Sequence, residues 1–133
     1  MDRFVLDSNI ISRILRQDRR VVPRLAEAAT SNATIYLCPV VYFEVRRGLL
    51  ERAASRQLRD FDHLARTLLW ADFERAIWDD ATQLWVACRA RGRPHDDADL
   101  LIAAYARHFQ ATLVTNNTGD FEDLGTPLVN WVA

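Results

Sequence analysis

Short segments that favour β-strands alternate along this chain with longer segments that favour helices. β-branched and aromatic residues mark the first kind, and apolar residues at helical spacing mark the second. Strands are expected at Phe4–Leu6, Thr34–Cys38, Leu68–Ala71, Thr112–Thr115 and Leu128–Trp131. A first helix is expected with Ser8 or Asn9 as its cap, running to about Arg16. Further helices are expected over Val22–Thr30, Val40–Ala53, Ser55–Leu68, Phe73–Arg91 and Asp96–His108. This alternation predicts an α/β fold, a three-layer α/β/α domain with a parallel sheet of four or five strands.

The chain length suits one hydrophobic core. With 133 residues, half of them hydrophobic, residues 1–133 are expected to form a single domain. No apolar run approaches the ~20 residues that a membrane helix needs. The opening "MDRFVLDS" lacks the layout of a signal peptide. A cytoplasmic location and no membrane association are therefore expected.

Cysteine and histidine usage does not suggest a metal site. Cys38 and Cys88 lie in apolar surroundings and are expected to be reduced and buried. The three histidines have no metal-ligand spacing, so each is expected to be structural or solvent-facing.

All seventeen basic residues are arginine, which excludes some phosphate-binding classes. A P-loop needs a lysine, and so does a phosphoacceptor receiver domain. Arginine itself gives planar, bidentate phosphate contacts. Arg46 and Arg47, and Arg91 and Arg93 in "RARGR", are therefore candidates to contact phosphate or RNA. A solvated charged face is the alternative for each.

Four acidic residues interrupt or border apolar segments. Asp7 ends "FVL", Glu44 lies inside "VVYFEV", Asp99 begins "DLLIAAYA", and Asp120 follows the fourth strand in "TNNTGDF". In a parallel sheet, the carboxyl ends of the strands and the following helix starts can converge on one edge. Taken singly, a helix-capping or turn role is as good an explanation for each. Taken together, the four predict a site.

Converging carboxylates repel one another, and a divalent cation offsets that cost. A set of oxygen ligands favours Mg²⁺ or Mn²⁺ over zinc. Mg²⁺ usually acts on phosphates, and water attack on a phosphodiester is a reaction that such a site supports. Asp7 and Asp99 are expected to hold the metal most directly, with Glu44 completing the site or orienting the water and Asp120 assisting.

Four motifs in this order resemble PIN-domain ribonucleases, specifically VapC-type toxins of type II toxin–antitoxin systems. They are "LDSNI" at Leu6–Ile10, "FEVRRGL" at Phe43–Leu49, "DLLIAAYA" at Asp99–Ala106 and "VTNNTGDF" at Val114–Phe121. The resemblance covers almost the whole chain. One departure is Cys38-Pro39, where relatives often carry Ser or Thr shortly before the second acid.

The resemblance implies a PIN-like fold and an activity. Asp7, Glu44 and Asp99 match the three acids that gather Mg²⁺ or Mn²⁺, and Asp120 matches a fourth. The polar residues that match positions orienting the acids or contacting phosphate are Ser8, Asn9, Thr115 and Asn117. The family hydrolyses RNA to a 5′-phosphate and a 3′-hydroxyl. Members usually form homodimers and are silenced by a cognate VapB-like antitoxin, so RNA, an antitoxin and a second copy are the expected partners.

Some alternatives stay open on the sequence. "HDDAD" offers Asp96 and Asp97 beside Asp99, although Asp99 fits the family spacing. The chain could be a catalytically silent binding module, or a different Mg²⁺-dependent phosphotransfer enzyme such as a phosphatase, although Asn9 stands where that class needs an aspartate. We expect Asp7→Asn to abolish cleavage with equal or higher stability. Trp85 and Trp131 are expected in the core.

Overall fold

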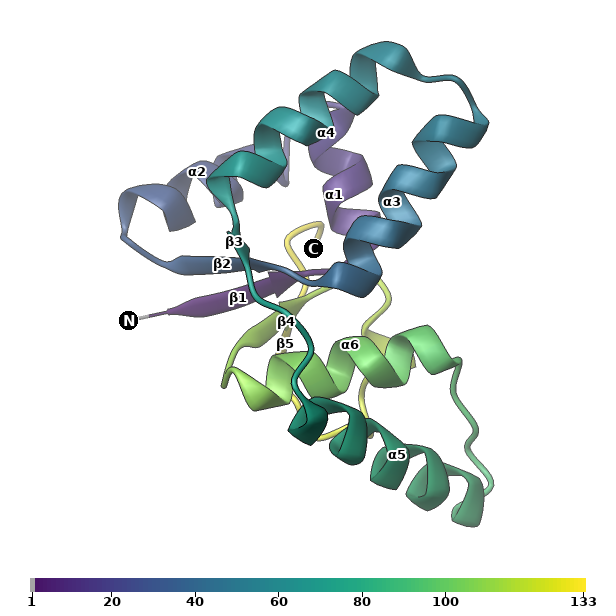
Figure 1. Cartoon of the computed structure of the whole chain (residues 1–133). Helices are drawn as coiled ribbons and strands as arrows, with labels where there is room; N and C mark the ends of the chain where they lie inside the picture. Colours follow the sequence, from purple (N-terminus) through teal and green to yellow (C-terminus); the bar gives the residue numbers. More distant parts are fainter. Residues whose placement is uncertain (1) are drawn as a thin grey trace.

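The computed structural model describes residues 2–133, which form a parallel sheet between two layers of helices (Figure 1). The strands are β1 (Arg3–Leu6), β2 (Thr34–Leu37), β3 (Leu69–Trp70), β4 (Thr112–Val114) and β5 (Leu128–Val129). The helices are α1 (Ser8–Leu15), α2 (Val22–Thr30), α3 (Pro39–Glu51), α4 (Ser55–Thr67), α5 (Arg75–Ala90) and α6 (Asp97–His108), with a 3₁₀ turn η1 (Thr118–Asp120). The predicted α/β/α fold with a five-stranded parallel sheet is confirmed.

The strand order is β3-β2-β1-β4-β5, with β1 in the centre. Helices α1 to α4 cover one face of the sheet, and α5 and α6 cover the other (Figure 1). Every neighbouring pair of strands is parallel, with Leu6 opposite Val114 and Val114 opposite Val129. The chain order therefore reverses beside β1, which is where ligands bind in open α/β sheets.

The sheet and both helix layers share one core. Val5 and Leu6 on β1 and Leu113 and Val114 on β4 are fully buried, as expected of strands covered on both faces. Tyr105, the largest fully buried side chain among the described residues, donates its hydroxyl to the Ala71 carbonyl oxygen at 2.8 Å. That hydrogen bond satisfies the polar group and ties α6 to the segment after β3.

Element boundaries differ from expectation mainly where strands end. Cys38 and Thr115 were expected inside strands but lie just after β2 and β4. Asp96 is the N-cap of α6, not its first helical residue. Strands β2, β3 and β4 each stop one residue earlier than expected, and β5 stops two residues earlier, whereas β1 ends at Leu6 as expected. Side chains just after the strands are therefore left at the rim to cap helices and bind one another.

The outcomes for cysteine and tryptophan are mixed. Cys38 and Cys88 are free and buried, as predicted, and Trp131 is also buried. The prediction for Trp85 was wrong, because its side chain is 43% exposed. Trp85 lies at the edge of the apolar stripe of α5, and the Arg89 guanidinium covers its ring at 4.6 Å. Across residues 2–133, no helix combines the length and the apolar character that crossing a membrane requires.

Candidate active site

Asp7 stands at the centre of the carboxyl edge of the sheet. Its backbone N–H continues the ladder to Val114 O at 2.9 Å, and its side chain caps α1 by accepting from Ser8 N at 2.8 Å. Its other carboxylate oxygen accepts from Thr115 Oγ1 at 2.8 Å and Asn9 Nδ2 at 3.1 Å. The side chain is 6% exposed, so these bonds hold a buried carboxylate in one orientation.

A belt of amides extends this network along the rim. Asn9 Oδ1 accepts from Asn116 N at 3.1 Å, and Asn130 Nδ2 donates to Asn116 Oδ1 at 3.2 Å. Asn117 N donates to Thr115 Oγ1 at 3.0 Å. The ends of β1, β4 and β5 are thereby linked by side chains, and Asp7 is positioned by residues from all three regions.

The cleft above this rim has a volume of about 460 Å³ and brings the predicted acids together. Five carboxylates and two arginines line it: Asp7, Glu44, Asp96, Asp99, Asp120, Arg47 and Arg52. Ser8, Asn9 and Asn117 also line it, while Thr115 is buried behind Asp7. The excess of carboxylates makes the cleft electronegative even though the chain as a whole is nearly neutral.

The pKa values of three of these acids are raised. Burial raises the pKa of Asp7, against the opposing effect of its hydrogen bonds to Thr115, Ser8 and Asn9. Burial and the charge of Asp7 raise the pKa of Glu44. Burial, followed by the charges of Asp7 and Asp120, raises the pKa of Asp99 to about 6. The metal-free cleft therefore disfavours full ionisation, as expected of a site built around a cation.

Glu44 also has an unsatisfied atom. Its Oε1 is buried and has no hydrogen-bond partner, although its pKa feels the opposing charge of Arg47. A buried acceptor without a partner costs about 1–3 kcal/mol, so such an atom needs a reason. A cation bound by oxygen ligands would satisfy it. Asp7, Glu44 and Asp99 thus fit Mg²⁺ or Mn²⁺ by donor type and by electrostatics.

The chain is similar to known proteins over nearly its whole length. The PIN domain family matches residues 4–126. This chain belongs to the PIN domain family. A plasmid stability protein, StbB, from Pseudomonas syringae pv. tomato is 31% identical over 138 residues, covering 98% of this chain and 99% of that protein.

Solved toxin–antitoxin structures share the PIN fold of this chain closely. The VapBC2 complex from Rickettsia felis, bound to a DNA fragment from its promoter, matches with a TM-score of 0.89 and 26% identity over 97% of this chain and 98% of that one. DNA-bound VapBC from Salmonella typhimurium matches with a TM-score of 0.85 and 25% identity over 98% and 99%. The predicted resemblance to VapC-type PIN domains is confirmed.

The "HDDAD" segment of this PIN domain divides between two surfaces. Asp96 and Asp99 line the acidic cleft, whereas Asp97 lines a separate hollow between α5 and α6 with Trp78 and Trp85. Their spacing explains the division, because residues three apart share a helical face and Asp97 is on another. The structure therefore groups Asp99 with Asp7 and Glu44 and leaves Asp97 outside.

The four candidate arginines lie in different places. Only Arg47 lines the cleft. Arg46 points to α4 and pairs with Asp62 at 2.7 Å, and Arg91 and Arg93 lie 3.4 and 3.8 Å from Asp123. The structure therefore does not bring these three to the acids.

Sequence reasoning missed Arg52, Asn116 and Asn130. Arg52 is the C-cap of α3, eight residues after Glu44, so helical periodicity places it on the cleft side and could have identified it. Asn130 follows an apolar strand just as Asp7 does, which is the same signal. Asn116 was inside a quoted motif but carried no assigned role.

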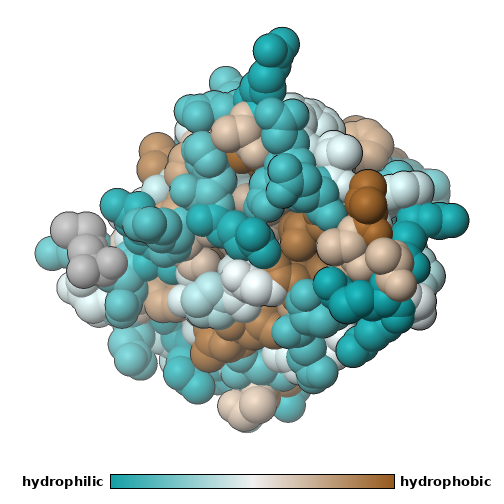
Figure 2. Space-filling view, turned by 90° about the horizontal axis from the view of Figure 1, so that it is seen from below, coloured by the Kyte–Doolittle hydropathy of each residue, from teal (hydrophilic) through white to brown (hydrophobic). Residues whose placement is uncertain are grey.

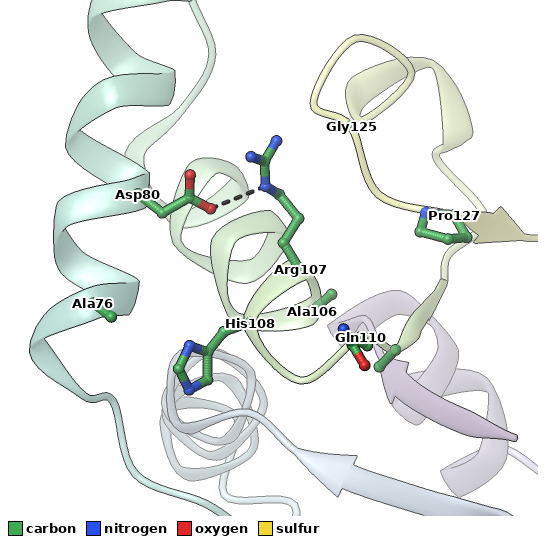
Figure 3. Close-up of a pocket in the computed structure, with 9 residues that line it drawn as sticks. Ala76, Asp80, Ala106, Arg107, His108, Gln110, Gly125 and Pro127 are labelled. Carbon is green, nitrogen blue, oxygen red and sulfur yellow. Dashed lines mark ion pairs between the residues drawn. The ribbon is translucent and has the colours of Figure 1, made fainter. Parts of the chain in front are cut away.

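A second hollow of about 580 Å³ lies at the other end of the sheet, where α6 leads into β4 (Figure 3). Its one guanidinium, Arg107, is already engaged by Asp80 at 2.9 Å and by the Leu124 carbonyl oxygen at 2.9 Å. Gly125, at φ +71°, leaves the room that Arg107 occupies. This hollow has a satisfied ion pair rather than unsatisfied charges, so the acidic cleft is the candidate active site.

Proposed function

We propose that this PIN-domain protein is a Mg²⁺- or Mn²⁺-dependent endoribonuclease and the toxin of a VapBC-type toxin–antitoxin pair. The observation that carries the proposal is the acidic cleft, in which Glu44 has an unsatisfied buried oxygen and Asp7, Glu44 and Asp99 have raised pKa values. PIN-family membership and the likeness to VapBC structures support it.

Asp7, Glu44 and Asp99 would hold the ion, with Asp120 assisting from the rim. When bound there, the ion supplies Lewis-acid catalysis and neutralises charge that develops on the phosphate oxygens. The side chains of the cleft would supply the remaining interactions. Asp7, held by its hydrogen bonds, would provide a fixed acceptor, and Glu44 would complete the ligand set or orient the attacking water.

Arg47 and Arg52 give the cleft a cationic wall for the RNA backbone. A phosphodiester cannot approach five carboxylates without positive charge nearby, and guanidinium groups bind phosphate oxygens in pairs. Water attacks the phosphorus, the bond to O3′ breaks, and the products are a 5′-phosphate and a 3′-hydroxyl, as the resemblance implies.

The alternatives are less well supported. In a silent binding module the acids would have no reason to keep an unsatisfied, mutually repelling arrangement. A phosphatase of the type considered needs a second aspartate at position 9, and Asn9 is instead bound on both sides of its amide, to Asp7 and to Asn116. Its role is structural support of the rim.

The deciding experiment compares Asp99→Asn with Asp97→Asn on a labelled RNA, using protein freed of any co-purified partner. Asp97 is the matched control, because it is two residues away and outside the cleft. We expect cleavage that needs Mg²⁺ or Mn²⁺ and stops with chelator. Asp99→Asn should lose at least a hundredfold in rate, as loss of a metal ligand does, with Asp97→Asn near wild type.

Metal binding is read separately by calorimetry with Mn²⁺. Wild type and Asp97→Asn should give a binding isotherm, and Asp99→Asn should bind about tenfold or more weakly. An Asp99→Asn protein that cuts RNA at the wild-type rate contradicts the proposal. Wild-type protein that shows no heat with Mn²⁺ and no cleavage supports the silent binding module instead.

The toxin–antitoxin part of the proposal predicts a docking surface. A groove of about 400 Å³ beside the acidic cleft is lined by apolar residues and shares Glu44 and Arg47 with it. Its lining includes Phe43, Trp78 and Leu101. A VapB-like antitoxin segment placed there would block RNA from the acids. A homodimer is also proposed, since the family usually forms one.

A further inference from the structure

A cysteine, a histidine and an aspartate from three separate segments meet beside the acidic cleft. Cys88 lies in the last turn of α5, His95 in the loop that leads to α6 (Figure 1), and Asp123 just after η1. Their ligand atoms, one sulfur, one imidazole nitrogen and one carboxylate oxygen, all lie within 4.8 Å of one another. Within residues 2–133, this is the one group of three such residues that meets that distance, so no three acids of the cleft bring their carboxylate oxygens equally close together.

The three side chains are shielded from solvent. Cys88 is fully buried, and the side chains of His95 and Asp123 are 9% and 15% exposed. Asp123 Oδ1 is buried and accepts no well-aligned hydrogen bond, although His95 Nε2 is 2.9 Å away. His95 Nε2 also lies 3.2 Å from Asp123 Oδ2, so the imidazole and the carboxylate already face each other beside the thiol, and Oδ1 is a buried acceptor without an aligned hydrogen bond.

Two arginines lie on the outer side of this group. Arg91 Nη2 is 3.3 Å from Cys88 Sγ and 3.4 Å from Asp123 Oδ2, and Arg93 Nε is 3.8 Å from the same Oδ2. Both arginines contact Oδ2, whereas Oδ1 faces His95 Nε2 at 2.9 Å. Both arginines are about half exposed, so either can turn to solvent.

We propose that Cys88, His95 and Asp123 bind one borderline-soft divalent ion of the Zn²⁺ class. Mixed sulfur, nitrogen and oxygen ligands suit Zn²⁺ and Co²⁺, whereas Mg²⁺ requires oxygen alone. A water completes the fourth position. Binding releases the thiol proton and leaves the ligating imidazole nitrogen unprotonated, so affinity rises with pH.

The site has a structural consequence for the acidic cleft. It fastens the loop that carries Asp96 to the turn that follows Asp120, and both of those acids line the cleft. The ion would therefore hold the outer edge of the cleft without taking part in its chemistry. No motif in the sequence indicates this site, because its three ligands come from separate segments that only the fold brings together.

The test is a Co²⁺ titration of metal-free protein in the presence of excess Mg²⁺, which fills oxygen-ligand sites. We expect one equivalent of Co²⁺ to give a sulfur-to-cobalt charge-transfer band in the near ultraviolet, and one equivalent of Zn²⁺ to remove it. Zn²⁺ should also raise the melting temperature, as any ligand selective for the folded state does. Wild-type protein without the band overturns the proposal and leaves the group as an ion-pair cluster.

Variants assign the band to its ligands. Cys88→Ser should abolish it, and His95→Gln should weaken Zn²⁺ binding at least tenfold. Cys38→Ser is the matched cysteine control, and Asp99→Asn is the control for the acidic cleft; both should keep the band. A band lost in Cys38→Ser but kept in Cys88→Ser contradicts the assignment. Circular dichroism checks that each variant is folded, and the wild-type titration decides even if one is not.

Discussion

Among the acids of the cleft, Asp99 has a strongly raised pKa. Its folded pKa is raised to about 6 from 3.8 by burial and by neighbouring acids. A raised pKa contributes stability that is fully present below the unfolded value and is lost as pH rises through the folded one. Metal-free protein should therefore lose stability between about pH 4 and pH 6.

Asp99→Asn should remove this loss of stability with rising pH. Each pKa unit corresponds to about 1.4 kcal/mol, and solvent screening of a partly exposed group reduces the effect, so we expect the variant to gain about 1–2 kcal/mol at neutral pH without metal. Chemical denaturation at about pH 5 and pH 7.5, with Asp97→Asn as control, measures it. An equal pH dependence in wild type and Asp99→Asn would contradict the assigned repulsion.

Substitution of Asp7 by Asn is expected to affect stability differently from Asp99→Asn, although the pKa of Asp7 is also raised. Asp7→Asn was expected from the sequence to be as stable as wild type or more so. In the structure, an amide at this position would set an NH₂ group against Asn9 Nδ2, which now donates to Asp7 at 3.1 Å. Asn9 cannot simply turn, because its oxygen accepts from Asn116 N.

We therefore predict that Asp7→Asn is less stable than Asp99→Asn by about 1 kcal/mol, the usual value of one lost hydrogen bond. Both should lose cleavage. The comparison of their unfolding free energies at neutral pH without metal tests the hydrogen-bond network separately from the chemistry. Equal stability of the two variants would mean that the network tolerates an amide.

At the scale of elements, local patterns located the helices and strands but not their neighbours. Alternation and periodicity are local, so every predicted helix and strand is present with small shifts of its ends. The strand order, the amide belt through Asn116 and Asn130, and the meeting of Cys88 with His95 and Asp123 depend on contacts between distant segments. Trp85 shows the same limit, since a helical stripe identifies the buried face but not where burial stops.

Two neighbouring arginines on α3 allow RNA binding and protein stability to be tested separately. Arg47 lines the cleft, and Arg46 pairs with Asp62 of α4. Arg47→Ala should reduce RNA affinity or kcat/KM by about tenfold, the effect of losing about 1.4 kcal/mol of phosphate contact. Arg46→Ala should leave RNA affinity near wild type and lower stability by less than about 1 kcal/mol, as for a partly exposed ion pair. Equal loss of RNA affinity in both would contradict the division.

At the scale of the whole molecule, apolar side chains are gathered on the surface at α5 and the neighbouring end of α3. Figure 2 views the molecule from the α5 side and shows apolar residues collected between hydrophilic ones. Phe43, Trp78, Trp85 and Val86 are each between 43% and 60% exposed. A cluster of large, exposed aromatic residues usually marks an interaction surface.

The proposed antitoxin should cover this surface, so a change there should affect binding more than folding. Trp78→Ser removes an aromatic ring that packs against Phe73 with centroids 5.2 Å apart and lines both apolar hollows. We expect it to weaken antitoxin binding by about 2 kcal/mol, roughly thirtyfold, as loss of a central aromatic contact does. Trp70→Ser is the matched control, because Trp70 is similarly exposed but lies on the edge strand β3.

Binding of the co-expressed partner by calorimetry, with the mass of the free protein by sedimentation, separates the two proposed assemblies. A Trp78→Ser protein that keeps the wild-type mass but loses the partner assigns the surface to the antitoxin. A protein that falls to half the wild-type mass assigns it to the contact between two copies, because a symmetric dimer loses the same ring twice. A Trp78→Ser protein with full affinity for the partner and an unchanged mass would show that this surface takes part in neither assembly.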